Sequence, residues 1–203
     1  MIHFLILMPF SRPQNVRLIK EAFAQSIKGA KCRVSLYAIC HEEEHAQMWE
    51  TSIVRRPPGD WDPCYWKCNQ AIDSLLPHSD GQEEYFGFLC DDDTYDPGLF
   101  AAMADHIAPY SLPHPRPEVI IISGRGWSNG DSVTVASEAC PKEMKIGRVG
   151  LRQYFIRSDV LHHFRFPNWA SGDGDIVEKM WQKNPNGFLF LPHLWGNWNK
   201  LPK

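Results

Sequence analysis

The sequence predicts an α/β fold in a single domain, with a mixed, mostly parallel sheet flanked by helices. Three observations support this prediction. The length of 203 residues is that of one domain. Hydrophobic residues make up 43% of the chain, which is enough to fill a globular core. Short apolar segments of strand length alternate along the chain with segments of helical periodicity, as in α/β proteins.

The first three elements are expected to form a strand–helix–strand unit. Residues 3–8 are nearly all apolar, which is typical of a strand covered on both faces. Apolar residues then recur at helical spacing over residues 16–27, and Gly29 is expected to end this helix. Residues 32–40 alternate like a second strand. A helix between two such strands predicts a parallel crossover.

The middle of the chain continues the alternation. The predicted elements are a short exposed helix over 41–50, a brief strand at 51–54, an aromatic helix around 66–76 and a buried strand at 85–90. Asp96 and Pro97 are expected to cap a helix that runs through Ile107.

The last hundred residues carry further strand patterns and one clear helix. Strands are predicted at 119–122, 133–135, 151–156 and 188–191, with a Gly/Ser/Asn-rich loop at 124–131. A helix is expected after Asp175, and residues 193–198 are expected to form a tail. The sequence shows no internal repeat and no linker long enough to divide it, so residues 1–203 are expected to form one domain.

Composition excludes several classes of protein. A formal net charge of −3 argues against a nucleic-acid-binding protein, which would carry a basic excess. No apolar run approaches the length of a membrane span. The first residues lack a basic leader with a cleavage site, which predicts a soluble, cytoplasmic protein with reduced cysteines. Cys64 and Cys68 have no second pair at zinc-binding spacing and are expected to be buried on one helix face.

Three consecutive aspartates, Asp91, Asp92 and Asp93, directly follow the predicted strand 85–90. Ligands of open α/β sheets collect at the carboxyl ends of strands, and clustered carboxylates repel one another unless a cation offsets their charge. Carboxylates suit Mg²⁺ or Mn²⁺. In an extended stretch Asp91 and Asp93 would share a side and form a metal seat, whereas Asp92 would face a sugar hydroxyl. The alternative is a solvated acidic turn before a helix.

A second acidic pair, Asp173 and Asp175, lies in a glycine-flanked segment at the start of a predicted helix. Either residue could serve only as a helix N-cap. Both uses are compatible if Asp175 caps the helix and Asp173 faces a cleft. There Asp173 could accept the proton of an attacking hydroxyl as a general base.

These residues together resemble the nucleotide-sugar glycosyltransferases of the GT-A fold, especially the family 2 type. The resemblance runs through nearly the whole chain in the expected order. It is carried by Leu7-Met8-Pro9-Phe10-Ser11-Arg12, by Lys67-Cys68-Asn69-Gln70-Ala71-Ile72, by Phe88-Leu89-Cys90-Asp91-Asp92-Asp93 with Asp96-Pro97, and by Gly172-Asp173-Gly174-Asp175-Ile176-Val177-Glu178-Lys179. The order and spacing of these segments are more specific than any one of them.

The resemblance implies a division of labour between residues 1–93, which would bind the nucleotide, and residues 94–203, which would bind the acceptor. Contacts to the nucleotide sugar are expected from Pro9, Phe10, Arg12, Lys67, Asn69 and Asp92. Mn²⁺ or Mg²⁺ is expected on Asp91 and Asp93, completed by His193. Asp173 would be the catalytic base, and acceptor contacts are expected from Trp169, Asp175 and Trp195. The alternatives are a half-buried histidine in an aromatic tail for His193, a solvated helix lysine for Lys67, and core or rim packing for Trp169 and Trp195.

The implied reaction moves a sugar from a nucleotide-diphosphate sugar to a hydroxyl of a carbohydrate or other acceptor, with inversion of configuration. The family commonly pairs an aspartate triad with Mn²⁺ and UDP, so the resemblance favours a UDP-sugar. The Gln-x-x-Arg-Trp motif of processive synthases is absent, which favours transfer of single sugars. The chain departs from the family pattern at Cys40-His41-Glu42, where an acidic residue often holds the base, and at Gly172, where glutamate is usual.

Two alternatives stay open at the level of sequence. A nucleotidyltransferase also holds Mg²⁺ on carboxylates beside a nucleotide, but it normally has a Gly-rich, basic loop after its first strand, and residues 9–13 here contain no glycine. A non-catalytic nucleotide-sugar or carbohydrate-binding module would keep the fold and lack the transfer reaction.

Overall fold

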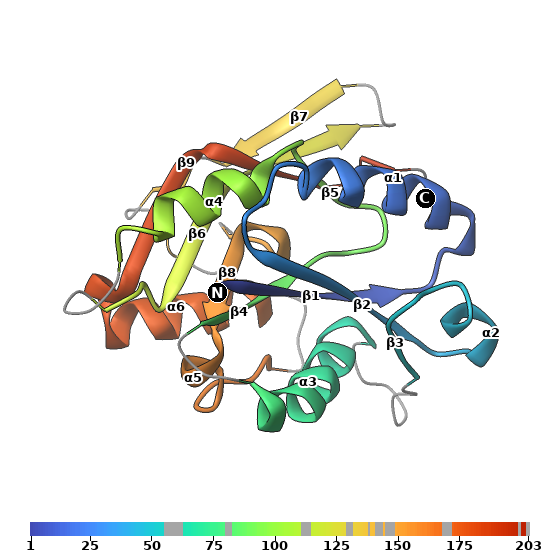
Figure 1. Ribbon diagram of the computed structural model, residues 1–203, viewed down its shortest axis with the longest axis horizontal. Coiled ribbons are helices and arrows are strands. Elements are labelled where there is room, and N and C mark those ends of the chain that lie inside the picture. Colours follow the sequence, from blue (N-terminus) through green and yellow to red (C-terminus); the bar gives the residue numbers. More distant parts are fainter. Residues whose placement is uncertain are drawn as a thin grey trace.

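The sheet lies between two layers of helices (Figure 1). The structure is a computed structural model that describes residues 1–54, 63–79, 83–110, 115–128, 132–137, 139–140, 144, 149–167, 172–198 and 200–201. Within these residues, nine strands form one mixed, mostly parallel sheet. The predicted single α/β domain of Rossmann-like, GT-A type is therefore confirmed.

The strands of this sheet follow one another in the order β3-β2-β1-β4-β8-β6-β9-β5, and β7 pairs with β6 outside this path. Their bounds are β1 His3–Phe10, β2 Arg33–Cys40, β3 Ser52–Val54, β4 Glu84–Phe88, β5 Thr94–Tyr95, β6 Val119–Ser128, β7 Ser132–Ser137, β8 Tyr154–Arg157 and β9 Phe188–Trp198. Strands β1 to β4 are mutually parallel, and β8 runs antiparallel to both β4 and β6. Strand β9 is parallel to β6.

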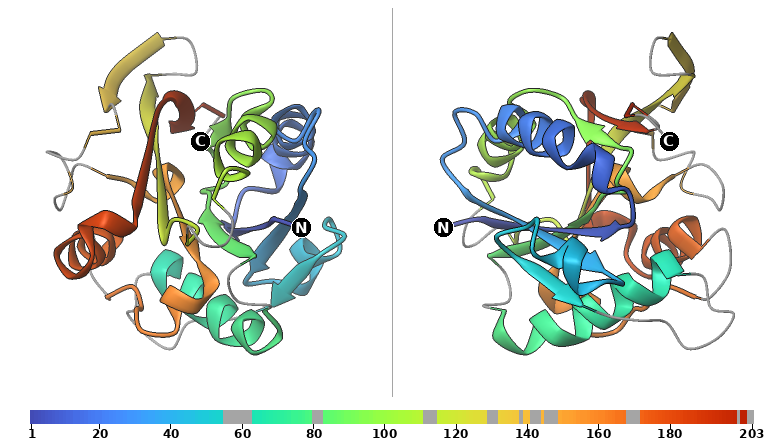
Figure 2. Two further views of the ribbon diagram at one scale, coloured as in Figure 1. Left: turned by 60° about the vertical axis from the view of Figure 1, so that its left-hand side comes forward. Right: turned by 90° about the vertical axis from the view of Figure 1, so that its right-hand side faces the viewer.

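The helices divide between the two faces of the sheet. Their bounds are α1 Val16–Ser26, α2 Glu43–Ala46, α3 Pro63–Leu75, α4 Leu99–Ile107, α5 Ser158–Leu161 and α6 Gly172–Lys183. Short 3-10 turns occur at Pro13–Asn15, Leu76–His78, Leu151–Gln153 and Pro185–Gly187. Helices α1 and α4 cover one face, and α3, α5 and α6 cover the other, as two views show (Figures 1 and 2).

Each face of the sheet has its own hydrophobic core. Strand β1 contributes to both, because alternate residues of its buried run point to opposite faces. Phe4 and Ile6 pack with Phe100 of α4, whereas Leu5 and Leu7 pack with residues of α3 such as Ile72. The predicted crossover is confirmed, since β1 pairs in parallel with β2 through the intervening helix α1.

The second half of the chain differs from the prediction at β6. The expected loop over 124–131 is wrong for residues 124–128, which continue β6 and pair with β7. Glycines at 124 and 126 suggested a loop, but they are needed here because a Cβ atom on either would lie 2.6 Å from a side chain of the neighbouring segment, Gln153 or Trp198. The paired ends of β6 and β7 extend beyond the helical layers (Figure 2).

The expected tail over residues 193–198 is instead the second part of β9. Strand β9 pairs with β6 up to Leu191, and pairing resumes at Trp195, so residues 192–194 form a bulge. Pro192 explains the interruption, because proline has no N–H to donate to a sheet. The Pro192 carbonyl instead accepts a 2.8 Å hydrogen bond from the hydroxyl of Ser123.

Two further local predictions are wrong. Asp96 does not cap α4 with its side chain; Gly98 is the N-cap residue, with a φ of 72° that favours glycine, and the Asp96 side chain binds Arg125 and Asn197. The first three residues of the expected strand 151–156 form a 3-10 turn. The Gln153 side-chain oxygen accepts the N–H of Gly150 at 2.9 Å and stabilises that turn.

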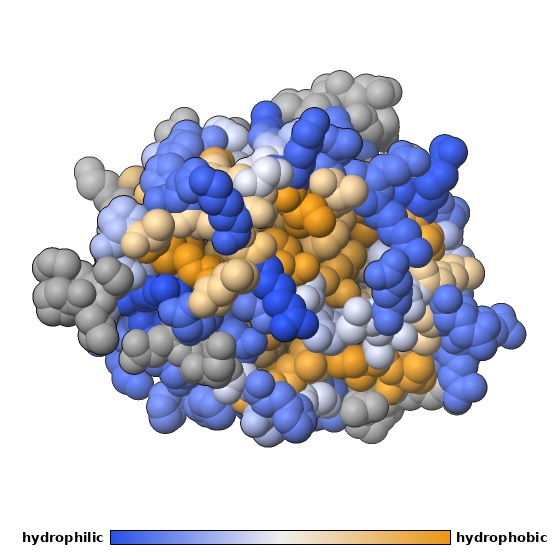
Figure 3. Space-filling view, viewed as in Figure 1, coloured by the Kyte–Doolittle hydropathy of each residue, from blue (hydrophilic) through white to orange (hydrophobic). Residues whose placement is uncertain are grey.

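A shallow groove lies between α1, β2 and the segment that precedes β3. Its lining is mostly apolar: Phe23, Ala24, Ile27, Val34, Leu36 and Trp49 contribute, together with Lys20, Ser35, Glu50 and Thr51. Hydrophobic residues are exposed in patches on this side of the molecule (Figure 3).

No helix in the described part of the chain is long and apolar enough to cross a bilayer.

Candidate functional site

The predicted nucleotide-binding segments meet where β1 and β4 end. The two strands are in register from His3 opposite Glu84 to Leu7 opposite Phe88. The Leu89 N–H donates to the Leu7 carbonyl at 3.0 Å, so the segments that follow the two strands begin side by side. Ligands of α/β sheets bind at this carboxyl edge.

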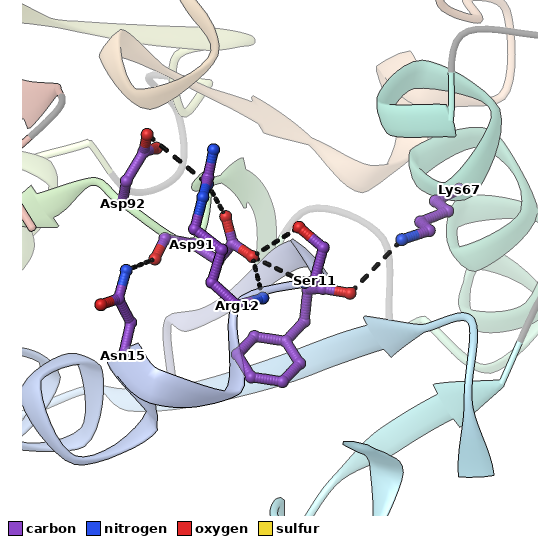
Figure 4. A network of polar contacts seen from close by, with 7 residues as sticks. Ser11, Arg12, Asn15, Lys67, Asp91 and Asp92 are labelled. Carbon is purple, nitrogen blue, oxygen red and sulfur yellow. Dashed lines mark hydrogen bonds and ion pairs between the residues drawn. The ribbon is translucent and has the colours of Figure 1, made fainter. Parts of the chain in front are cut away.

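Asp91 is the centre of a dense polar network (Figure 4). Its Oδ2 accepts hydrogen bonds from the Ser11 N–H at 2.6 Å, the Ser11 hydroxyl at 3.0 Å and the Arg12 N–H at 2.8 Å. Its Oδ1 is ion-paired with the Arg12 guanidinium. The Asn15 side chain donates to the Asp91 carbonyl at 3.0 Å. Asp91 therefore fixes the conformation of the loop that follows β1.

The Arg12 guanidinium also reaches a second carboxylate, with its Nη1 3.5 Å from Asp92 Oδ2 (Figure 4). Asp91, Asp92 and Asp93 are all buried. The assumption of an extended stretch is wrong, since the Asp93 N–H donates to the Cys90 carbonyl at 3.0 Å and closes a turn. Neighbouring carboxylates in this turn do not alternate between opposite sides as in a strand, which allows one guanidinium to approach both Asp91 and Asp92.

Lys67 of α3 brings a second positive charge to this loop. It is only 3% exposed, and its ammonium group donates to the Phe10 carbonyl at 3.4 Å (Figure 4). Burial lowers the pKa of Lys67, whereas the nearby thiols and the Asp91 carboxylate favour the charged form. A buried lysine with such a long hydrogen bond is well placed to bind an anion at the end of β1.

Asp173, the predicted general base, lies in the first turn of α6. Its Oδ1 accepts the Gly174 N–H at 2.8 Å, and its carboxylate also accepts hydrogen bonds from the Tyr65 hydroxyl and the Leu151 N–H. Burial raises the pKa of Asp173 above its ordinary value, and these donors with the charge of Arg152 only partly oppose the shift. A carboxylate with a raised pKa is a better proton acceptor than an ordinary one.

The raised pKa of Asp173 predicts a pH-dependent stability. The unfolded chain loses this proton at the ordinary carboxyl pKa, and the folded chain holds it to higher pH. The folded state therefore binds more protons in that interval, and the free energy of unfolding falls as pH rises through it. Asp173→Asn removes this loss, so its stability relative to the wild type should rise as the pH increases above the ordinary carboxyl pKa of about 4. Urea unfolding of both proteins across this range measures the difference, and a pH-independent difference would contradict the assignment.

The first turn of α3 links Asp173 to the aspartate turn. The thiol of Cys64 is hydrogen-bonded with that of Cys90, the residue that precedes Asp91. The next residue, Tyr65, is hydrogen-bonded with Asp173. Two adjacent residues of one helix thus contact both halves of the candidate site. The structure brings the predicted base to the same end of the sheet as the predicted nucleotide loop.

Arg152 adds a positive charge near Asp173. Its guanidinium lies 4.5 Å from the ring centroid of Trp198, and its charge acts on both Asp173 and Tyr95. A Cβ atom on Gly196 would lie 2.8 Å from the Arg152 carbonyl, so glycine is required for this close approach. No motif in the sequence marked Arg152, Tyr65 or Asn15, because their roles depend on contacts between distant segments, and Ser11 was marked only as part of the segment 7–12.

Several predicted residues lie elsewhere. His193 is in the β9 bulge, exposed, with its ring 4.9 Å from that of His106, and β5 pairs with β9 at residues 196 and 197 rather than near His193. The structure does not bring His193 to the aspartates. Asp175 lies inside α6, is buried and pairs with Lys179 at 2.7 Å, so it is not the N-cap. Trp195 lies under the Arg125 guanidinium, and Trp169 is outside the described residues.

Asn69, a predicted nucleotide contact, clamps a distant segment instead. Its amide nitrogen donates to the Phe166 carbonyl at 2.9 Å, and its oxygen accepts the Phe166 N–H at 3.0 Å. The clamp fixes the Phe166 ring, which stacks on Tyr65 with centroids 5.5 Å apart. Asn69 thus stabilises the position of Phe166, which in turn packs against Tyr65 of the candidate site.

We expect Asn69→Ala to lower the free energy of unfolding by about 1–3 kcal/mol, because two backbone groups lose their partner. Chemical denaturation measures this loss, and Gln70→Ala at the next position is the matched control. A variant of unchanged stability that binds nucleotide more weakly would instead support the direct nucleotide contact.

The oxygen atoms of Asp91 that would bind the expected divalent cation already have other partners. Asp91 already accepts three hydrogen bonds on one oxygen and an ion pair on the other, which uses the acceptor capacity of a carboxylate. Across the described ranges, no group of three or more His, Cys, Asp or Glu side chains is arranged to hold a metal ion. The set predicted from the sequence, Asp91, Asp93 and His193, therefore does not fit a metal as the chain is arranged.

Fold and site geometry together define a Rossmann-like α/β protein of GT-A type with a polar site at the carboxyl edge of its sheet. No protein-family model matches the sequence, and no curated protein matches it. Solved structures of S. aureus TarS are similar in fold. The TarS 1–349 complex with UDP-GlcNAc is 14% identical over 97% of this chain and 58% of the TarS chain, with a TM-score of 0.61.

Two other TarS structures give the same result. The complex of TarS 1–349 with UDP is 13% identical over 97% of this chain and 60% of the other, with a TM-score of 0.59. A longer TarS chain is 14% identical over 87% of this chain and 33% of its own length, with a TM-score of 0.57. This chain thus spans less than two thirds of the TarS chains. At this level of identity the likeness shows a shared fold.

Proposed function

We propose that this protein transfers a sugar from a nucleoside diphosphate sugar to an acceptor hydroxyl, with Asp173 as the general base. The observation that carries the proposal is the convergence of four groups at one edge of the sheet. These are the loop after β1, the buried ammonium of Lys67, the aspartate turn after β4, and the partly buried carboxylate of Asp173. Cations that can meet a diphosphate and a carboxylate that can accept a proton are the two requirements of this reaction.

The reaction follows from the movement of charge. The acceptor oxygen forms a bond to the anomeric carbon of the sugar, and the bond from that carbon to the diphosphate oxygen breaks. The electron pair of the broken bond leaves with the nucleoside diphosphate, and the hydroxyl proton goes to Asp173. In this proposal Lys67, which contacts the loop after β1, stabilises the negative charge that develops on the diphosphate. A base on the face opposite the leaving group inverts the anomeric configuration.

The fold comparison supports the choice of donor. TarS is a glycosyltransferase, and two of its structures contain UDP and UDP-GlcNAc. A uridine diphosphate sugar is therefore the first donor to test. A nucleotidyltransferase is disfavoured because the loop between Phe10 and Pro13 is held by Asp91 and contains no glycine-rich phosphate cradle.

Calorimetric titration of the protein with UDP, UDP-GlcNAc and GDP tests the proposal. Binding of the uridine nucleotides supports it, and release of UDP from UDP-GlcNAc with water or an added hydroxyl compound as acceptor completes it. NMR of the product reports the anomeric configuration. Nucleotide binding without hydrolysis or transfer would identify a binding module, and binding of no nucleotide sugar would refute the proposal.

A further inference from the structure

The Arg12 guanidinium lies between two buried carboxylates, where a divalent cation was expected. It pairs with Asp91 and lies 3.5 Å from Asp92. We infer that Arg12 supplies the positive charge that holds the donor diphosphate against the aspartate turn, so that donor binding needs no metal ion. This inference rests on the proposed function and concerns which cation that site uses.

The first argument is the saturation of Asp91. A metal ion binds a carboxylate through the same lone pairs that hydrogen bonds use. Asp91 spends them on Ser11 and Arg12, and two of the four donors are backbone N–H groups of the loop itself. A cation could bind Asp91 only by displacing contacts that fix this loop.

The second argument is the exposure of the paired groups. The Asp91 side chain is 3% exposed and that of Asp92 is 9% exposed, whereas that of Arg12 is 31% exposed. The side chain of Arg12 is thus more accessible to a ligand than either carboxylate with which it is paired. A guanidinium has five N–H donors in a planar fork and binds phosphate oxygens as well as carboxylates. Arg12 can therefore keep its contact with Asp91 and donate to a diphosphate.

The third argument is the preorganisation of Arg12. Its backbone N–H is bound to Asp91 at 2.8 Å, and its guanidinium returns to the same carboxylate. Both ends of the residue are held before a ligand arrives, so little conformational freedom is lost on binding. Without Arg12, Asp91 and Asp92 would lose this positive charge and would repel an anionic donor more strongly.

The test is calorimetric titration with UDP in EDTA and in excess Mn²⁺, for the wild type, Arg12→Ala, Arg12→Lys and Arg17→Ala. Arg17 is the matched control, since its side chain is 83% exposed on α1 and it faces Glu21. The wild type and Arg17→Ala should bind UDP equally well in EDTA and in Mn²⁺. Arg12→Ala should bind about 10- to 100-fold more weakly in EDTA, the effect of losing a hydrogen bond to a charged group. Arg12→Lys should fall between them, because it keeps the charge and loses the fork.

Rescue sharpens the test. Methylguanidinium, or Mn²⁺ bound in the space left by the guanidinium, should restore UDP affinity to Arg12→Ala and leave the wild type unchanged. Wild-type binding that is lost in EDTA and returns with Mn²⁺ would overturn the inference and leave the proposed function intact. Wild-type protein that binds UDP in neither condition, and no other nucleotide sugar, would refute the proposed function itself. Circular dichroism of each variant tests whether it is folded. If Arg12→Ala does not fold, Arg12→Lys still tests the inference, because it keeps a positive charge beside the carboxylates.

Discussion

Asp173→Asn is expected to reduce the turnover number of sugar transfer by about 10²–10⁴-fold, the usual contribution of a general base. Asparagine keeps the size of the side chain and can still accept the Gly174 N–H, but it cannot take up the proton of the acceptor. UDP affinity should stay within about twofold, since Asp173 faces Tyr65 and Leu151 rather than the loop after β1. Initial rates of UDP release and calorimetric UDP binding measure the two effects separately.

Asp73→Asn is the control for this experiment. The Asp73 side chain is 53% exposed on α3 and pairs with Arg165 at the surface, so this variant loses a carboxylate of similar charge away from the site. It should turn over at the wild-type rate. The reaction of the wild type should also increase with pH through the raised pKa of Asp173, and Asp173→Asn should lose that dependence. Full activity of Asp173→Asn would remove Asp173 from the base role.

Phe155→Ala should lower the free energy of unfolding by about 3–5 kcal/mol, more than any other substitution proposed for this protein. Phe155 of β8 is fully buried, and its ring contacts those of Phe4, Tyr95 and Phe100 at centroid distances of 5.7–6.0 Å. The ring also fills the space beside Gly87, where a Cβ atom would lie only 2.6 Å away. Removing the ring leaves a cavity. Its four neighbours lie on different elements and cannot all move inward to fill it.

Urea unfolding with circular dichroism measures this loss. Phe155→Leu, which keeps most of the volume, should cost less than about 1.5 kcal/mol, and Met48→Ala, at an exposed position, should stay within about 0.5 kcal/mol. A Phe155→Ala variant that loses less than the leucine variant would show that the cavity model is wrong.

The first half of the fold was predictable because its signals are local. The buried run of β1 and the helical spacing of α1 determine a crossover whose hand and direction are general properties of such units. The β6–β9 region was harder to predict, since Gly124 and Gly126 indicate a loop when read locally. They are glycines because Gln153 and Trp198, both distant in sequence, approach the strand closely.

The candidate site, like the fold, was predictable from the sequence only in part. The spacing of the aspartates from β4 placed them correctly at the carboxyl edge, next to the loop that carries Arg12. The partners of Asp91 could not be read from the sequence, because they depend on a turn that only the folded chain forms. His193 failed for a related reason: the bulge after Leu191 moves the strand on by three residues before pairing resumes.

The bulge at residues 192–194 separates two parts of β9 that make different contacts. Residues 188–191 are fixed by the core, and residues 195–198 carry Trp198 to Arg152 and Asn197 to Asp96. Since residues 192–194 pair with neither neighbour in register, a change of length there need not shift either part. Related chains could therefore vary the distance between the sheet and the segment that carries Trp198 by insertion or deletion at this point, while the interior of the domain stays the same.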